Sequence, residues 1–470
     1  MAIYRTPGVY IEEISKFPPS VAGVETAIPA FIGFTEKAAD AQGNSLVDTP
    51  TRITSLLEYE QLFGGAQVKQ LAVDVAEGAA GISVTFNADP GLPDQFLYYS
   101  MQLFFANGGG PCYVVSIGDY AAAGAAAAAD FTDAFVPLAA FDEPTLVVFP
   151  DAALLDDVGH GDVVDAALTH CQTMQDRFTL ADVRNALPGG TEDNADVTNN
   201  FRNNVASDVD LVKYGAAFFP YVRTSLPWRT DDAQVTIVSH AGGPPADAIA
   251  DNTPLGNVKN SHTAVYNAVK QFLNAATVTL PPSGAVAGVY ARVDRTRGVW
   301  KAPANASLLN VIEPAIKITN DDNDGLNVDA GSGKSVNVIR AFTGKGTLVW
   351  GARTLAGNDN ENRYVPVRRF LIFAEESIKK AIAAFVFEPN DGNTWIKVRS
   401  MIESFLTRQW RDGALAGAKA DDAFYVSVGL NKTMTAQDIL DGRMIVEVGL
   451  AIVRPAEFII LQFVQKLQES

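Results

Sequence analysis

Short apolar runs alternate with helical patterns over the first 220 residues of the chain. The run AFIGFT at 30–35 is typical of a buried strand. The segment 53–65 predicts a helix, because its apolar residues follow helical spacing and Gly64-Gly65 end it. Further helices are expected at 98–105 and 161–177, and further strands at 112–117, 145–151, 178–183 and 214–222. This alternation favours an α/β sheet that helices cover on both faces.

Two stretches inside this region lack such a pattern. Residues 66–95 are rich in Gly, Ala and Asp, and residues 186–210 are rich in Asn, Asp and Gly. Residues of these types favour turns and exposed loops. We therefore expect both stretches to be surface loops.

The pattern changes near residue 340. Long amphipathic helices are expected at about 367–387 and 394–411. Strands are expected before and after them, at 347–355, 423–430, 444–453 and 457–467. Such a grouping is typical of an α+β unit of roughly 115 residues.

Both ends of the chain are expected to be β-segments without partners. The first 20 residues resemble an arm, with a Pro7-Gly8 turn before β-forming residues and Pro18-Pro19 after them; these residues are Val9, Tyr10, Ile11 and Ile14. In the last predicted strand both faces are apolar, with Ile459, Leu461 and Phe463 on one face and Phe458, Ile460 and Val464 on the other. A terminal strand of this kind promotes aggregation unless another strand pairs with it.

The whole chain therefore divides into four predicted parts. They are an arm with its linker at 1–27, an α/β domain at 28–340, an α+β domain at 341–455 and a second arm at 456–470. We expect an α/β and α+β multidomain protein.

Composition excludes several classes of protein. Of 470 residues, 47% are hydrophobic and 19% are charged, so the chain can form packed cores. A net charge of −18 disfavours nucleic acid as a partner, since nucleic-acid binding requires clustered Lys and Arg. Two cysteines, Cys112 and Cys171, form no disulfide framework and fit a reducing compartment. The N-terminus lacks the pattern of a signal peptide, and no apolar run predicts insertion into a membrane.

An ordered set of motifs then points to one family. Each motif is weak alone, but the set extends from one end of the chain to the other; it comprises YRTPGVYIEEI (4–14), TAIPAFIGFTEKA (26–38), FFANGGGPCYVVSI (104–117), TLVVFPD (145–151), DRFTLADV (176–183), YGAAFFPYV (214–222), RGVWKAPAN (297–305), NVIRAFTGKGTLVWGARTL (337–355), YVPVRRFLIFAEESIKKA (364–381), FLTRQWRDGALAG (405–417) and RPAEFIILQF (454–463). Together they resemble the contractile tail sheath family of myovirus-type phages, R-type bacteriocins and phage-tail-like injection particles. The long middle region and acidic loops are closer to the phage and injection-particle branches, and all three kinds of particle stay open here.

The resemblance implies a structural protein with no enzymatic activity and no cofactor. It implies an outer α/β domain inserted between terminal segments that build an inner α+β domain. The terminal arms would add strands to neighbouring copies, which gives an open helical polymer. The implied partners are copies of the chain in stacked rings, an inner tube protein, baseplate and tail-terminator proteins, and sheath paralogues. Such particles are assembled in the bacterial cytoplasm.

The expected helix at 394–411 carries a candidate contact with the tube. At about 100° per residue, Lys397, Arg408 and Arg411 share one face. In the resembled family a helix of this domain touches the inner tube, so these cations would meet acidic groups there. The other interpretation is an ordinary solvated helix face.

Three motifs suggest other chemistry. GSGKS at 331–335 resembles the end of a phosphate-binding loop, but Val328 stands where that motif requires Gly, and a turn between domains is preferred. NDDNDG at 320–325 resembles a calcium loop, but Gly331 stands where the loop requires Glu, so we expect a turn.

The third motif offers an alternative function. His160, His170 and Cys171 follow a strand end that carries Asp151, the place where α/β enzymes hold their sites. The alternative is a hydrolase-like enzyme with a site at Asp151 and His160. These residues lack the sequence spacing of metal ligands, and we prefer to interpret the histidines as ordinary core or surface residues.

Overall fold

A computed structural model describes residues 20–185, 187, 194–242 and 248–462 of the chain. By its internal contacts the chain divides into two compact units. Unit 1 combines Met1–Val24 with Ala374–Val453, and unit 2 combines Glu25–Phe373 with Arg454–Ser470. One division between them therefore falls inside helix α12 (Val365–Ile382).

This division differs from the boundary predicted at residue 340, which lies inside β15 (Val336–Phe342). The strands β15 and β16 (Gly346–Trp350) form an antiparallel hairpin, and β15 also pairs in parallel with β8 (Gly215–Phe219). The hairpin thereby completes the large sheet of unit 2. The segment after residue 340 thus belongs partly to unit 2.

A nine-stranded sheet forms the centre of unit 2. Its strand order is β13-β16-β15-β8-β7-β6-β1-β5-β2, and the six strands from β15 to β5 run parallel. The strands not yet bounded are β1 (Pro29–Thr35), β2 (Thr51–Ile53), β5 (Cys112–Asp119), β6 (Leu146–Val148), β7 (Phe178–Asp182) and β13 (Ala306–Ser307). Every residue of β1, β6, β7 and β8 is buried, which confirms the predicted sheet with both faces covered.

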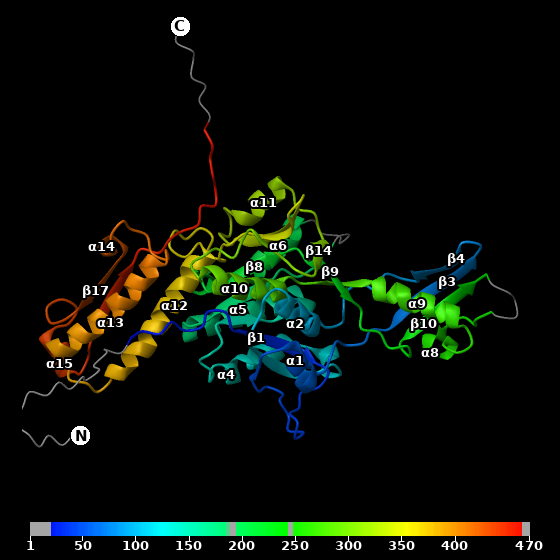
Figure 1. Ribbon diagram of the computed structural model, residues 1–470, viewed down its shortest axis with the longest axis horizontal. Helices are drawn as coiled ribbons and strands as arrows, with labels where there is room; N and C mark the ends of the chain where they lie inside the picture. The colour runs from blue at the N-terminus through cyan, green and yellow to red at the C-terminus, as the bar shows by residue number, and fades with distance from the viewer. Residues whose placement is uncertain (1–19, 186, 188–193, 243–247, 463–470) are drawn as a thin grey trace, which may run out of the picture. The chain divides into compact units, whose positions relative to one another are not determined.

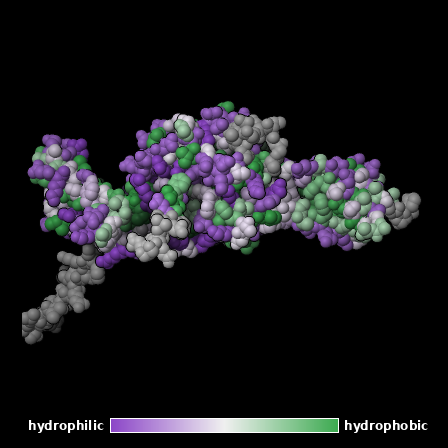
Figure 2. All heavy atoms as spheres, turned by 90° about the horizontal axis from the view of Figure 1, so that it is seen from above, coloured by the Kyte–Doolittle hydropathy of each residue, from purple (hydrophilic) through white to green (hydrophobic). Residues whose placement is uncertain are grey.

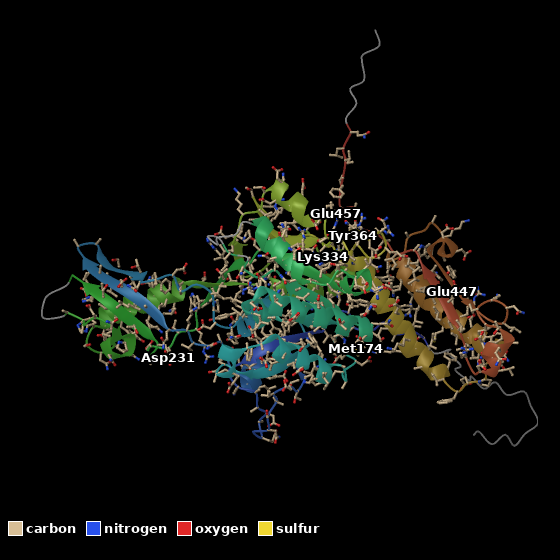
Figure 3. All side chains as sticks on the ribbon, turned by 180° about the vertical axis from the view of Figure 1, so that it is seen from behind. Met174, Asp231, Lys334, Tyr364, Glu447 and Glu457 are labelled. Carbon is tan, nitrogen blue, oxygen red and sulfur yellow. The ribbon has the colours of Figure 1, made fainter. Side chains whose placement is uncertain are left out.

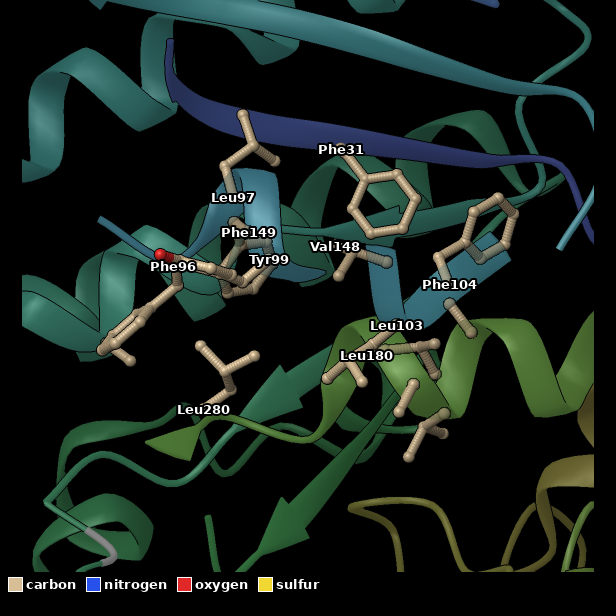
Figure 4. Packing of buried hydrophobic residues seen from close by; sticks show 14 of the residues in the cluster. Phe31, Phe96, Leu97, Tyr99, Leu103, Phe104, Val148, Phe149, Leu180 and Leu280 are labelled. Carbon is tan, nitrogen blue, oxygen red and sulfur yellow. The ribbon is translucent and has the colours of Figure 1, made fainter. Parts of the chain in front are cut away.

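Helices cover both faces of this sheet. The chain passes from β1 to β5 through α2 (Leu97–Ala106) and from β6 to β7 through α5 (Asp157–Met174), moving in opposite directions along the sheet. Because parallel crossovers are right-handed, α2 and α5 lie on opposite faces. Helix α10 (Ser283–Arg297) packs against α2 and against β6 and β7 (Figure 1). Figure 4 shows the core on this side, where Phe31, Val148 and Leu180 of the strands lie near Leu103 and Phe104 of α2.

Two buried carboxylates sit at the carboxyl ends of neighbouring strands and cap these helices. Asp182, at the end of β7, accepts hydrogen bonds from the backbone N–H and the hydroxyl of Ser283, the first residue of α10. Asp151, which follows β6, accepts hydrogen bonds from the backbone N–H groups of Phe96 and Leu97 at the start of α2. Each carboxylate satisfies N–H groups that a helix start leaves free, so the two aspartates fix α2 and α10 to the sheet.

The stretch 66–95, predicted to be a surface loop, instead contains two strands. It contains β3 (Leu71–Gly78) and β4 (Gly81–Phe86), which pair in a four-stranded sheet of order β11-β10-β3-β4 with β10 (Val235–Ala241) and β11 (Thr253–Pro254). The prediction was wrong because the Ala and Asp content hid the alternation of β3, in which Leu71, Val73 and Val75 are buried. Helices α8 (Leu255–Val258) and α9 (Thr263–Ala275) pack on this sheet.

The predicted loop at 186–210 is also partly wrong. Its described part contains α6 (Asn194–Asn204) and α7 (Val209–Val212), both of which pack against α5. The run 214–222 divides in two, since β8 ends at Phe219 and β9 (Val222–Pro227) joins a separate sheet of order β12-β9-β14. The remaining elements of unit 2 are α1 (Leu56–Phe63), η1 (Ala122–Ala125), α3 (Ala128–Asp133), α4 (Phe135–Leu138), η2 (Pro150–Leu154), β12 (Thr277–Leu280), β14 (Val311–Pro314) and α11 (Asn320–Asn327).

Unit 1 is an α+β unit built on two long helices. The predicted helices are confirmed as α12 and as α13 (Gly392–Arg411). The other elements are η4 (Ala383–Phe385), α14 (Ala420–Ala423), β17 (Phe424–Val428), α15 (Ala436–Leu440) and β18 (Val446–Leu450). The strand predicted at 457–467 is absent from its described part, because residues 457–462 belong to no strand.

Candidate assembly surfaces

Unit 1 exposes many large apolar side chains for its size. Phe387 is fully exposed, and further large hydrophobic side chains are open to solvent in both helical and strand regions: Val386, Ile396, Tyr425, Leu430, Leu440 and Ile445. Figure 2 shows hydrophobic residues mingled with hydrophilic ones, so in that view they form no single broad apolar face. Covering such side chains contributes roughly 25 cal/mol per Å² of apolar area, so a second chain would gain by packing on them.

Among the described residues, neither β17 (Phe424–Val428) nor β18 (Val446–Leu450) pairs with a third strand. Within the described chain their sheet consists of β17 and β18 alone, which pair antiparallel from Phe424–Leu450 to Val428–Val446. None of the residues of β18 is fully buried. A two-stranded sheet is marginal on its own, and its free N–H and C=O groups can pair with an added strand. This sheet is therefore a candidate acceptor for a strand from another chain.

The described part of the N-terminal segment is fastened to the helices of unit 1. The side chain of Val21 is buried, and its carbonyl accepts a hydrogen bond of 2.8 Å from Arg408 on α13. The backbone N–H of Val24 donates to the hydroxyl of Ser377 on α12 at 3.1 Å. The predicted strand residues Val9, Tyr10, Ile11 and Ile14 lie outside the described residues.

Helix α13 presents the predicted cations on its exposed face. Asp391 caps the helix start through the N–H groups of Asn393 and Thr394, and apolar residues such as Val398, Ile402 and Phe405 form its buried face. The opposite face exposes Lys397, Arg408 and Arg411, as the helical spacing predicts. Among the described residues no ion pair joins Lys397 or Arg411 to an acidic group, whereas Arg408 bonds to Val21. Two of the three cations are thus free to meet a partner.

The C-terminal segment carries the most continuous apolar exposure. Phe458, Ile459, Ile460 and Leu461 are 70%, 78%, 81% and 74% exposed. Four consecutive exposed hydrophobic side chains are unusual on a protein surface, so this segment is a candidate for contact with a partner. Phe463 and Val464, the other two residues predicted for this arm, lie outside the described residues.

The lysine of the GSGKS motif has a structural role. Lys334 is buried, and its ammonium group donates to the carbonyls of Arg202 and Val205 at the end of α6. In return Arg202 donates to the carbonyl of Lys334 at 3.0 Å. Cations at a helix C-terminus satisfy its free carbonyls, so Lys334 holds α6 in place. The expected turn is present at residues 330–332, but it lies inside unit 2 and not between domains, since the chain continues through Lys334 and Ser335 into β15.

The residues of the calcium-like motif form the helix α11 and not the expected turn. Thr319 caps this helix, accepting from the backbone N–H of Asp322, and the Asp322 carboxylate bonds back to the N–H of Thr319. This reciprocal pair is a capping box. The acidic residues of the motif therefore begin a helix.

The hydrolase-like alternative finds no support at Asp151 and His160. All three hydrogen bonds described for the Asp151 carboxylate come from backbone N–H groups, those of Phe34, Phe96 and Leu97. Burial raises the pKa of Asp151 to about 6 and lowers the pKa of His160 to about 4. In the described chain no hydrogen bond joins the two side chains. Asp151 instead fastens β1 and α2.

The neighbouring candidates also belong to the core. Burial raises the pKa of Cys171 to about 12, and its sulfur lies 3.2 Å from the Thr179 hydroxyl oxygen. Burial lowers the pKa of His170 to about 4, and its Nε2 lies 3.1 Å from Arg177. A neutral thiol and a neutral buried imidazole are poor starting points for nucleophilic catalysis.

A cavity of about 470 Å³ lies beside Asp151, lined also by Gln95, Leu154 and Asp156. Across residues 20–462, apart from the gaps given above, no group of three His, Cys, Asp or Glu side chains could hold a metal ion. Likewise, none of the helices described here is long and apolar enough to cross a membrane.

Sequence comparisons identify two family domains. Residues 226–355 match the family model for the phage tail sheath protein central domain, and residues 358–466 match the model for the phage tail sheath C-terminal domain. A tail sheath protein of Burkholderia phage BcepMu is 29% identical over 186 residues. That match spans 38% of this chain and 38% of the phage protein.

Comparisons with solved structures extend the likeness over the full chain. The sheath complex of the extracellular contractile injection system PVC, in its contracted state, is 31% identical with a TM-score of 0.66, covering 99% of both chains. The helical sheath of the anti-feeding prophage (AFP), also contracted, is 31% identical with a TM-score of 0.64, covering 99% of this chain and 100% of the other. A chain of the contracted AFP baseplate is 27% identical with a TM-score of 0.68. Two family domains in sequence, and a full-length match at 31% identity, place this chain in the contractile tail sheath family.

Proposed function

We propose that this chain is the structural subunit of a contractile sheath, and that its copies polymerise helically around an inner tube. Contraction of the polymer would drive the tube through a target envelope. The observation that carries the proposal is the full-length similarity to sheath chains of PVC and AFP particles. The same particles support a baseplate as a second partner, since one related chain comes from the AFP baseplate.

Strand addition between copies would hold the polymer together. The proposed donors are the two terminal arms, with Val9, Tyr10, Ile11 and Ile14 in one and Phe458–Leu461, Phe463 and Val464 in the other. The proposed acceptor is the open edge of the β17–β18 sheet, which offers free backbone groups and exposed Tyr425 beside it. An added strand satisfies those groups and covers apolar side chains at once. The contact is head-to-tail, so it extends without closing.

Contraction would come from a change of packing between copies. A sheath assembled in an extended state stores free energy if a second packing buries more surface. Unit 2 would then move as a body while the arms keep neighbouring copies linked. This role requires no catalytic step and no nucleotide.

The exposed face of α13 would meet the inner tube. Lys397 and Arg411 are exposed and lack described acidic partners, and Arg408 shares their face. Acidic groups on the tube would pair with these cations and set the register between sheath and tube.

The polymer is tested by electron microscopy of the purified chain. We expect negatively stained samples to contain tubes or stacked rings, because the arms supply strands to neighbouring copies. Deleting residues 458–470 should leave a folded monomer with unchanged circular dichroism, because the described strands and helices all end before that segment. A monodisperse monomer from the full chain, over a wide concentration range, would contradict the proposal.

The tube contact is tested by charge reversal. Arg408 also holds Val21, so the key variant changes only Lys397→Glu and Arg411→Glu. The matched control is Lys419→Glu with Lys432→Glu, which alters two exposed lysines of the same unit by the same charge. We expect tube binding to fall at least about tenfold for the first pair and less than about twofold for the control. Equal binding by both variants would remove the tube face from the proposal.

A further inference from the structure

A single carboxylate fastens the C-terminal segment to unit 2. Glu457 accepts two hydrogen bonds from the Arg353 guanidinium, from Nη2 at 2.6 Å and from Nε at 3.0 Å. It also accepts from the amide of Asn327 at 2.8 Å and from the hydroxyl of Tyr364 at 3.2 Å. Figure 3 labels Tyr364 and Glu457, whose side chains lie close together. Three side chains from separate parts of the sequence therefore converge on one residue.

The partner residues are themselves held firmly. The Arg353 side chain is only 4% exposed, and its Nη1 donates to the carbonyl of Asn327 at 3.1 Å. Asn337 of β15 bonds to both the N–H and the carbonyl of Arg353, each at 2.8 Å. Burial by itself would raise the pKa of Glu457, but bonds from Arg353, Asn327 and Tyr364 outweigh it and hold the pKa below its ordinary value of 4.5. The site is thus preorganised for an ionised carboxylate.

Glu457 lies where the chain re-enters unit 2, just before the exposed C-terminal residues. The chain leaves unit 2 through α12, which begins one residue after Tyr364. It comes back to unit 2 at Arg454, after the whole of Ala374–Val453. Glu457 fastens this return to Tyr364, the residue before α12 begins. The exposed residues Phe458–Leu461 follow at once.

We propose that Glu457 is a positioning residue that anchors the C-terminal arm, so that the arm leaves unit 2 from one fixed point and reaches a second copy of this chain in one register. The proposal rests on the strand addition proposed above. With the anchor in place, the free arm begins at Phe458. Without it the arm begins near Arg454, and four more residues extend its reach by about 13 Å at roughly 3.3 Å per residue.

An anchor of this kind determines what the arm can pair with. A strand that slips by one residue turns its side chains to the opposite face. An arm that starts from a fixed point can reach its acceptor in fewer registers. Less conformational entropy is therefore lost when the arm pairs with the acceptor. Glu457 would therefore act on assembly while contributing no contact to the neighbouring copy.

The first experiment measures the anchor itself by the rotational mobility of a nitroxide label on Phe458→Cys, with the full chain kept below its polymerisation concentration. Both native cysteines are buried, so the label attaches at the exposed position. Glu457→Gln should shorten the rotational correlation time of the label at least about twofold, because the segment is no longer held by a charge-assisted contact. The matched control is Glu313→Gln, whose ion pair with Arg223 is about half exposed at both residues and which should leave the mobility of the label unchanged.

A second variant separates the anchor from damage to unit 2. Glu457→Gln alone leaves the Arg353 cation buried without its carboxylate, which could destabilise its surroundings. Arg353→Met combined with Glu457→Gln removes both charges. We expect the same increase in label mobility, with hydrogen exchange in the nine-stranded sheet unchanged. A label that stays as immobile in both variants as in the unchanged chain would overturn the proposal.

The third experiment tests the fixed register by inserting one Gly on either side of Glu457. An insertion between Val453 and Arg454 precedes the anchor and should leave the yield of polymer within about twofold. The same insertion between Glu457 and Phe458 shifts the arm by one residue, turns its side chains to the opposite face and should lower the yield at least about tenfold. In the Glu457→Gln background the two insertions should act alike. Equal effects of both insertions in the unchanged background would overturn the anchor.

The experiments distinguish a failure of the proposed sheath function from a failure of the Glu457 anchor. If the unchanged chain forms no polymer, the proposed function fails, whereas the mobility of the label still decides whether Glu457 anchors the segment. If the chain polymerises and the insertions do not differ, the sheath function stands and the anchor is rejected.

Discussion

The two units of this chain differ most in charge. The segments of unit 1 contain 11 Lys and Arg against 13 Asp and Glu, whereas those of unit 2 contain 25 against 41. Nearly all of the net charge of −18 therefore belongs to unit 2. A strongly acidic surface keeps copies apart, while a nearly neutral one with exposed apolar side chains favours contact.

The units also differ in how their sheets are completed. Unit 2 surrounds fully buried parallel strands with helices, and it needs no other chain to close its core. In the described part of unit 1 the sheet has two strands, and no residue of β18 is fully buried. The comparison supports the proposal that unit 1 and the arms carry the contacts between copies, while unit 2 supplies a closed core.

The largest effect is expected when a buried side chain in the core of unit 2 is truncated. Phe104 is completely buried, with its ring 5.2 Å from that of Phe31. Phe104→Ala should lower the free energy of unfolding of unit 2 by about 3–5 kcal/mol, because it removes apolar contacts and leaves a cavity. Urea denaturation measures the change, with Phe104→Leu as the control of smaller effect. A loss below about 1 kcal/mol would show that the core tolerates truncation, and it would weaken the contrast between the closed core of unit 2 and the less buried sheet of unit 1.

The next effect concerns pH and the Asp182 cap. Burial raises the pKa of Asp182 from its ordinary value of 3.8 to about 7, although Ser283 partly opposes the shift. The folded unit thus keeps a proton that the unfolded chain has lost. This contribution to stability is full below pH 3.8 and is lost as pH rises through about 7.

Asp182→Asn removes this titration. The stability of the variant relative to the unchanged chain should therefore increase by about 2 kcal/mol between pH 5 and pH 8. Denaturant unfolding at each pH measures the slope, and Asp231→Asn in an exposed turn is the control for surface charge. A difference that stays constant across this range would contradict the buried, proton-holding cap.

A matched pair of surface changes separates assembly from stability. Phe387 is fully exposed in unit 1 and Leu57 is 65% exposed in unit 2. Neither Phe387→Ser nor Leu57→Ser should change the free energy of unfolding by more than about 0.5 kcal/mol. If unit 1 carries the assembly surface, only Phe387→Ser should raise the concentration needed for polymerisation, as sedimentation would show. A larger rise in this concentration for Leu57→Ser than for Phe387→Ser would contradict the assignment of the assembly surface to unit 1.

The smallest effect concerns an exposed ion pair on α13. Arg399 and Glu403 lie one helical turn apart, with 2.7 Å between Nε and Oε1. Arg399→Ala should lower the stability of unit 1 by only about 0.3–0.5 kcal/mol, since solvent screens exposed pairs. Thermal unfolding in low and high salt measures this, and the difference should shrink as salt is added. A salt-independent loss would indicate packing by the arginine stem instead.

The sequence predicted the elements well where periodicity was strong. The buried strand at 30–35 and the helix at 394–411 appear as β1 and α13, and the cations of α13 share the expected exposed face. The loops predicted at 66–95 and 186–210 failed because Ala, Asn and Asp obscured a strand alternation and a short helix. Turn-forming residues are a local signal, and tertiary packing overrides it.

The candidate residues divide in the same way. Exposure of Phe458–Leu461 follows from four adjacent apolar residues at the end of the chain, a signal that sequence carries directly. The anchor at Glu457 left no such signal, because Arg353 lies 104 residues away. Both residues stand inside family motifs, at 337–355 and 454–463, but nothing in those motifs relates one to the other. Likewise, nothing in the sequence relates Lys334 to the carbonyl of Arg202, 132 residues away.

The sequence by itself determined the family, the alternation that builds the central sheet, and the apolar ends of the chain, because these depend on local order and spacing. Only the tertiary structure decided where the chain divides, that the GSGKS lysine closes a helix, and that Asp151 and Asp182 cap α2 and α10. Each of those outcomes depends on which backbone N–H and C=O groups become buried and need a hydrogen-bond partner in place of water. Packing between distant segments decides which groups these are.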